Sequence, residues 1–470
     1  MLGLFGALDL ASRSLATQQA GTTVAGQNMA NVNNPAYARE QTVIQTSDSI
    51  ETSAGEEGTG ADVVSITEAR DSLLDNQIQS ENSVTGSFTA QQTALQNAEA
   101  YLGEQLSSTS SSSSATSSSN GLAAMLSNLF NSFSSMTTDA GDSATVVQAA
   151  QAVTNQFNQV SANLSQVRSN LNTTIQNNVA SCNQDLNQIA TLNQQIVQAE
   201  AGGGTANNLV DTREQTIENL AGLVNISTTA QSNGSVNISI GGVSMVAGSS
   251  AVDGLQTYDA GGGQLLIQDE NSATPLSVTG GSIGGNITAR DGALSTLQTS
   301  LDTLASQLVT QVNNIYSAGY DSSGGTGQLF FTGNSAANIS VNSALVSDPS
   351  QFQASSTAGA GGDTKIALAL ANLSTQTIPA LGNKSLSQSY SQTVSNLGNA
   401  IDAATNQLNT SQAISTSLTN QRSSESGVSI DQEMTDLMEY QKAYEASAQL
   451  VTTLDSMMET VIDMKPATDS

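Results

Sequence analysis

Few residue types in this chain could carry acid–base or nucleophilic chemistry. Histidine is absent and Cys182 is the only cysteine, so zinc sites built on these residues, intrachain disulfides and Ser-His-Asp triads are excluded. Cys182 lies between Val179 and Leu186 with no basic residue nearby to lower its pKa. We interpret it as a buried structural thiol rather than a nucleophile.

Three further patterns could hold a phosphate, a metal ion or a catalytic acid. The glycine runs 202–204 and 261–263 lack the Lys-Ser/Thr that completes a phosphate-binding loop. Asp321, followed by Ser-Ser-Gly-Gly, lacks the later acidic ligands of a calcium loop. The pair Glu56-Glu57 has no second carboxylate cluster to work with. We interpret all of these as loops, and predict no catalytic residue, no metal ligand and no cofactor.

The overall composition points to a polar, acidic protein. The 470 residues carry a net charge of −29, with 37% hydrophobic and only 11% charged residues. Neutral polar side chains must therefore solvate most of the surface, since typical soluble domains carry about 25% charged residues. The acidic balance argues against nucleic acid and anionic membranes as partners. No apolar run reaches the roughly 18 residues of a membrane span, and the first 15 residues lack the basic start of a secretory signal peptide.

The two ends of the chain carry apolar residues at helical spacing. The pattern predicts one helix over about 4–29 and a second over about 437–461. Neither stripe is stable in water without a partner helix, which is either the other end of the same chain or a neighbouring molecule; we favour the neighbour. The residues we assign to this assembly interface are Leu4, Leu8, Leu15, Met29, Leu437, Tyr440, Tyr444, Val451, Leu454 and Met458.

Between the ends, further helices enclose a β-rich segment. Helical patterns cover 87–106, 144–200, 209–223, 293–316, 364–373 and 385–421. Alternating runs on either side of Asn233-Gly234 predict a β-hairpin, with positive φ at both turn residues. Short strand-like runs follow at 243–246, 265–268 and 275–279, and the serine-rich stretch 107–119 is expected to be an exposed loop.

This order predicts a nested α+β multidomain protein. We expect a terminal α-helical coiled-coil layer from residues 1–40 with 427–470. A long-helix bundle domain would combine 41–221, 287–320 and 363–426. An inserted β-rich outer domain would combine 222–286 with 321–362.

Two motifs resemble a known family. The segment from Gln27 to Arg39 is similar to the N-terminal signature of flagellar rod, hook and hook-associated proteins, on Asn28, Asn31, Pro35, Tyr37 and Arg39. The segment from Ser426 to Met458 resembles the C-terminal motif of the hook-associated members, on Gly427, Tyr440 and Gln441. Ala36 stands where the family usually has glycine.

The resemblance implies a structural adaptor at the hook–filament junction that is required for filament assembly and is not an enzyme. It implies type III export with a dedicated chaperone and an extracellular place in the flagellum. The implied partners are a ring of copies of this chain, the hook protein and the second junction protein.

Two alternatives stay open on the sequence alone. One is an extracellular adhesin or effector carried on a flagellar scaffold. The other is a peptidoglycan hydrolase, against which the absence of histidine and of convergent carboxylates argues.

Overall fold

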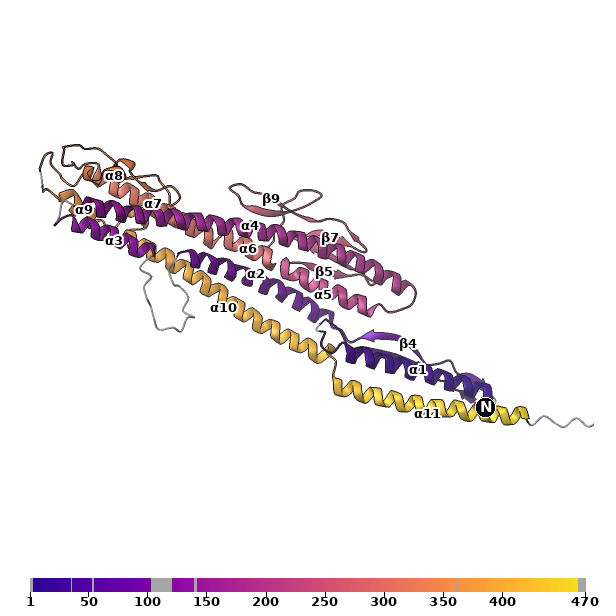
Figure 1. Cartoon of the computed structure of the whole chain (residues 1–470). Coiled ribbons are helices and arrows are strands. Elements are labelled where there is room, and N and C mark those ends of the chain that lie inside the picture. The colour runs from indigo at the N-terminus through magenta and orange to yellow at the C-terminus, as the bar shows by residue number, and fades with distance from the viewer. Residues whose placement is uncertain are drawn as a thin grey trace, which may run out of the picture.

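The computed structural model describes residues 3–34, 36–52, 55–102, 121–138, 142–360 and 362–463. The described part is an elongated, mostly helical rod (Figure 1). Its α-helices are α1 (Leu4–Ala30), α2 (Ser72–Leu102), α3 (Leu122–Ser135), α4 (Ser143–Ala201), α5 (Asn207–Leu223), α6 (Gly281–Asp291), α7 (Ala293–Tyr316), α8 (Ser343–Ser347), α9 (Lys365–Asn372), α10 (Leu386–Ser426) and α11 (Ile430–Asp463).

The strands form small separate antiparallel sheets. β1 and β4 pair with each other, and so do β2 and β3 between them; β5 to β8 make a four-stranded sheet; β9 pairs with β10 and β11 with β12. Their bounds are β1 (Glu40–Thr46), β2 (Ile50–Thr52), β3 (Gly55–Glu57), β4 (Ala61–Glu68), β5 (Ser227–Ala230), β6 (Val236–Ile240), β7 (Val243–Ala247), β8 (Ser250–Ala251), β9 (Leu255–Asp259), β10 (Leu265–Asp269), β11 (Phe331–Thr332) and β12 (Ser340–Val341).

Most of the expected helices and strands are confirmed, and the two terminal helices are among them. Helix α2 begins at Ser72, well before the expected residue 87. The sequence pattern does not predict its first part, because polar side chains such as Ser83 and Ser87 occupy buried positions and interrupt the apolar spacing. The expected strand 275–279 is reduced to an isolated bridge between Pro275 and Gln268. The sequence analysis did not predict strands β1 to β4, β8, β9, β11 and β12 or helices α3, α6 and α8. The stretches 107–119 and 464–470, with Pro35, lie outside the described residues.

The hairpin at Asn233-Gly234 is confirmed, but the expected turn geometry is wrong. Only Gly234 has a positive φ, of 82°. The loop is longer than a two-residue turn, because the last paired residues are Ala230 and Val236. A loop of this length needs one left-handed residue rather than two.

The 59-residue helix α4 runs through the bundle and contributes to two hydrophobic cores. The first core joins its N-terminal half to α3, α7, α9 and α10. The second core joins its C-terminal half to α5 and to strands β6, β7, β9 and β10, which cover one side of the helix (Figure 1). The alternating burial of β6 supplies Val236, Ile238 and Ile240 to that core.

Residues 321–362 pack differently from the expectation. Their apolar side chains, including Phe330, Phe331 and Phe352, belong to the first core and not to the core under the β5–β8 sheet. Phe330 lies at the centre of an aromatic cluster, with its ring 5.7 Å from Phe133 and 5.2 Å from Tyr316. The aromatic contacts therefore hold this segment at the far end of the bundle. The three domain boundaries themselves stay a prediction.

Phe330→Ala tests this cluster. Phe330 is fully buried, so removing its ring should lower the free energy of unfolding by about 3–5 kcal/mol through lost contacts and a cavity. Urea titration followed by circular dichroism measures the change. The adjacent Leu329 is 47% exposed, and Leu329→Ala should stay within about 0.5 kcal/mol of the parent protein. Equal effects of the two substitutions would contradict the assigned core.

Candidate assembly surface

The two ends of the chain form an antiparallel helix pair. Helices α1 and α11 pack side by side at one end of the rod (Figure 1). Gly21 lies so close to Tyr440 that a Cβ atom at Gly21 would be 2.7 Å from the tyrosine ring. Ser14 and Ser447 share a hydrogen bond of 2.9 Å between their hydroxyls. Because Gly21 has no side chain, the ring of Tyr440 can pack directly against the backbone of α1.

The residues predicted for assembly lie mostly along this pair. Leu454 is buried, and Tyr444 is 43% exposed. The others are half-buried: Leu4, Leu8, Leu15, Met29, Leu437, Tyr440, Val451 and Met458. Of the two partners that the sequence left open, the structure brings together the two ends of one chain. Contacts of these ten residues with other molecules stay a prediction.

Other apolar side chains of this region remain uncovered. About two thirds of the exposed large hydrophobic residues in the described chain lie between residues 5 and 73 or in α11. On α11 two groups stand at helical spacing, and their members are each 44–58% exposed: Ile430 with Met434 and Met438, and Leu450 with Met457 and Val461. Contiguous exposed apolar surface marks interaction sites in soluble proteins.

Residues of the N-terminal motif form a buried hydrogen-bonded cluster beside the helix pair, which we call the joint. Its members are Asn28, Tyr37, Arg39, Glu40 and Glu433. Asn28 is 1% exposed, and its side chain makes four hydrogen bonds. Its Nδ2 donates to the Glu40 carbonyl (2.9 Å) and to Glu433 Oε2 (3.0 Å). Its Oδ1 accepts from the Tyr37 hydroxyl and from the Glu40 amide, both at 2.9 Å. Every donor and acceptor of this amide is thus used to tie α1, β1 and α11 together.

Arg39 extends the joint to α10 and α11. Its Nε donates to Glu433 Oε1 at 2.6 Å, and its Nη2 donates to Asp436 Oδ2 at 3.2 Å. Its backbone amide donates to the carbonyl of Ser426, the last residue of α10 (2.8 Å). Glu433 is only 2% exposed, and a carboxylate buried to this degree requires such partners.

Arg70 connects the same region to the bundle. Its guanidinium pairs with Glu68 at 3.1 Å and Asp75 at 3.2 Å, and it also donates to Asp211 of α5. Asp211 in turn accepts from the Ala38 amide at 3.3 Å. One cation therefore faces three carboxylates from β4, α2 and α5.

Burial raises two pKa values in this cluster. Burial, and then the nearby Asp211, raise the pKa of Glu68 to about 7, against the opposing effect of Arg70. Burial raises the pKa of Asp211 to about 6, again opposed by Arg70. Glu68 Oε1 is buried and finds no hydrogen-bond partner among the described residues, so its carboxyl group is the weakest-paired member of the cluster.

The remaining motif residues have smaller roles in the structure. Asn31 caps α1 and its side chain donates to the Gln27 carbonyl of its own helix. Gln441 is exposed. Gly427 lies where a Cβ atom would be 2.1 Å from the Ser423 carbonyl oxygen, so only glycine fits between α10 and α11. Ala36 has no positive φ.

The candidates for catalysis or ligand binding remain apart. Cys182 is fully buried in the second core, and burial raises the pKa of its thiol. Asp321 accepts from the backbone amides of Ser323 and Gly325 within a turn. Among the described residues, no three His, Cys, Asp or Glu side chains are grouped as metal ligands. The described helices include none that could span a membrane.

The sequence did not indicate that Glu40 and Glu433 belong to the joint, or that Arg70 and Asp211 form the cluster beside it. Glu433 stands in the first turn of α11, where the helix dipole favours an acidic residue whatever its partners are. Its partners Asn28 and Arg39 lie about 400 positions away, so no local pattern indicates the contact.

Asn28→Leu tests the joint. Leucine has a similar volume but leaves Glu433 and the Glu40 backbone groups with unmet hydrogen bonds, each worth about 1–3 kcal/mol. We expect amide hydrogen exchange to accelerate by at least tenfold in α1 and α11, with α4 unchanged. Asn31→Leu is the matched control and should leave exchange in both terminal helices near the parent rate. Acceleration spread evenly over the bundle would contradict a local joint.

Glu68→Gln tests the pH dependence of the carboxylate cluster around Arg70. A raised pKa in the folded protein means that the stability contribution is complete below the unfolded pKa, near 4.5, and is lost as the pH rises through about 7. The free energy of unfolding should therefore fall by about 1–3 kcal/mol between pH 5 and pH 8. Glu68→Gln should make this fall smaller in urea titrations and leave the share of Asp211, whose pKa is also raised. A parent protein whose stability rises over the same interval would refute the assignment.

Comparison with known proteins supports a flagellar origin. Residues 108–331 match the family model described as the flagellar hook-associated protein FlgK helical domain. Residues 419–464 match the model of the flagellar basal body rod FlgEFG protein C-terminal region. The second match covers all of α11 together with the end of α10.

Whole-length relatives agree with these matches. The flagellar hook-associated protein 1 of Bacillus subtilis is 28% identical, over 98% of this chain and 99% of that protein. The Escherichia coli protein of the same name is 24% identical, over 97% and 99%. The solved structure of the flagellar hook junction protein FlgK from Burkholderia pseudomallei has a similar fold, with a TM-score of 0.63 and 16% identity, over 74% of this chain and all of that one. Over nearly its whole length, the chain is therefore similar to flagellar hook-associated protein 1 (FlgK).

Proposed function

We propose that this protein is a structural adaptor of the bacterial flagellum, located at the junction between hook and filament and required for filament assembly. The observation that carries the proposal is the concentration of exposed apolar side chains on the terminal helix pair and its strands. The Burkholderia pseudomallei protein of similar fold is a flagellar hook junction protein, which supports the same assignment.

The terminal unit, meaning α1, β1–β4 and α11, has the properties of an assembly element. Its helices are held together internally by Gly21 and Tyr440. They are anchored to the bundle by the backbone amide of Arg39, which donates to Ser426 of α10, and by Arg70, which pairs with Asp211 of α5. The apolar side chains that remain outside would be covered by neighbours. Copies of this chain in a ring, the hook protein and the second junction protein are the partners we propose for them.

The joint fixes the direction of the terminal unit relative to the helical bundle. Because Arg39 contacts the ends of both α10 and α11, the direction of the terminal helices relative to the bundle is set by buried polar contacts. The bundle and the β-rich segment would then project outward from the assembled unit. We also propose extracellular placement after export, assisted by a chaperone.

A double substitution on α11 tests the proposal. In a strain that lacks its own copy, Leu450→Asp with Met457→Asp should give hooks without filaments and monomeric flagellin in the medium. The two side chains are 44 and 52% exposed, so the protein should fold, but the new carboxylates would be buried unpaired in any contact, at several kcal/mol each. Electron microscopy and motility assays measure the outcome.

The matched control lies on the bundle. Ile414 of α10 is 45% exposed, and Ile414→Asp should support normal filaments. Melting of each purified protein shows that the fold survives. Normal swimming of the α11 double variant would refute the assembly role of this surface.

A further inference from the structure

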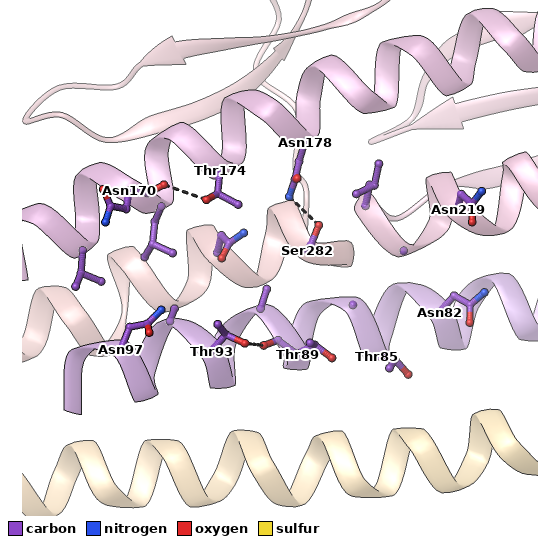
Figure 2. A pocket seen from close by; sticks show the side chains of 18 of the residues that line it. Asn82, Thr85, Thr89, Thr93, Asn97, Asn170, Thr174, Asn178, Asn219 and Ser282 are labelled. Carbon is purple, nitrogen blue, oxygen red and sulfur yellow. Dashed lines mark hydrogen bonds between the residues drawn. The ribbon is translucent and has the colours of Figure 1, made fainter. Parts of the chain in front are cut away.

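A cavity of about 820 Å³ opens between α2, α4, α5 and α6, in the middle of the bundle (Figure 2). It lies apart from the terminal unit, so a ligand bound in it would be independent of the junction role. Its volume falls in the range of about 300–1,000 Å³ that is typical of ligand sites. Ionisable side chains are rare in its wall: Glu218, which already accepts from Arg422, and Tyr101 at one end.

Asparagine amides recur along the wall of this cavity. Figure 2 shows Asn97 and Asn170 at one end and Asn82 and Asn219 at the other. Asn286 of α6 also lines the cavity and is only 5% exposed. Within the described residues, the side chain of Asn286 makes no hydrogen bond. Its donors and acceptor are therefore available to a ligand in the cavity.

Much of the rest of the wall is small and uncharged. Gly86, Ala90 and Ala94 lie along the α2 side, Thr174 and Ser282 add hydroxyls, and the larger apolar side chains are Val167, Leu171 and Leu223. A ligand of high charge would meet no unpaired counter-charge among the described lining residues, and a saccharide would find an aromatic ring only at Tyr101. A peptide backbone fits better, because an asparagine amide can donate to its carbonyl and accept from its N–H.

The dimensions favour an extended peptide. Asn82 and Asn97 are 15 positions apart on α2, or about 22 Å at 1.5 Å per residue. That length matches about six or seven residues of extended chain at about 3.3 Å each. A helix of the same length and about 10 Å in diameter would fill roughly 1,700 Å³, about twice the cavity volume. We propose that this groove binds an extended, uncharged peptide segment of six or seven mostly small residues.

The test selects the ligand from a displayed library of random heptapeptides, using the full-length protein as bait. We expect the selected sequences to be uncharged and poor in bulky side chains. The best synthetic peptide should bind the full-length protein with a Kd that calorimetry can measure. Failure of any heptapeptide to bind above background, or selection of charged sequences, would overturn the proposal.

Three variants show whether the selected peptide occupies this groove. Asn286→Leu removes the buried amide and should weaken binding by about tenfold or more. Ala90→Phe places a ring in the groove and should abolish binding. Asn155→Leu changes an exposed asparagine of α4 that does not line the cavity, and it should leave the Kd unchanged.

Two readouts separate a binding defect from misfolding and from another ligand class. Asn286→Leu should melt at or above the parent temperature, because no internal hydrogen bond is lost among the described residues. If it binds the peptide as tightly as the parent protein does, the groove is not the site. Chitotetraose is the saccharide probe, and binding of chitotetraose that Asn286→Leu abolishes would assign the groove to sugars instead.

Discussion

The arrangement of the whole molecule depends on one buried carboxylate. Glu433 at the start of α11 is removed from water, which would cost several kcal/mol if it stood alone. Arg39 and Asn28 satisfy it, and both come from the opposite end of the chain. Because a charge at this depth tolerates only a narrow geometry, the contact fixes α11 against α1. It also fixes the pair relative to the end of α10, where the Arg39 amide meets Ser426.

Close backbone approach is the corresponding constraint in the bundle. A Cβ atom at Gly86 would lie 2.4 Å from the Gly222 carbonyl, and one at Gly285 would lie 2.2 Å from the Ser87 carbonyl. These glycines let α5 and α6 contact α2 directly, although glycine disfavours a helix by about 1 kcal/mol. Gly86 and Gly222 also line the cavity of Figure 2, so the cavity borders this close contact between α2 and α5.

The sequence by itself determined much of the local structure and the family. Apolar spacing located most of the helices, including α1, α4 and α11, because a helix buries every third or fourth side chain whatever its partner is. Alternation around Asn233-Gly234 located the β5–β6 hairpin, for a similarly local reason. The motifs around Asn28 and Tyr440 indicated the flagellar family. The lack of histidine, with a single cysteine, limited the possible chemistry before any fold was known.

Only the tertiary structure decided which surfaces meet. The apolar stripes of α1 and α11 were compatible with a partner in the same chain or in another one, because hydrophobic burial is not directional, and the sequence favoured the other chain. The segment 321–362 joined the first core through Phe330 and its neighbours, although its composition resembled that of the β-rich part. The joint and the groove rest on contacts such as Arg39 to Glu433, nearly 400 positions apart. Such contacts depend on how helices pack, and no local pattern of residues encodes that.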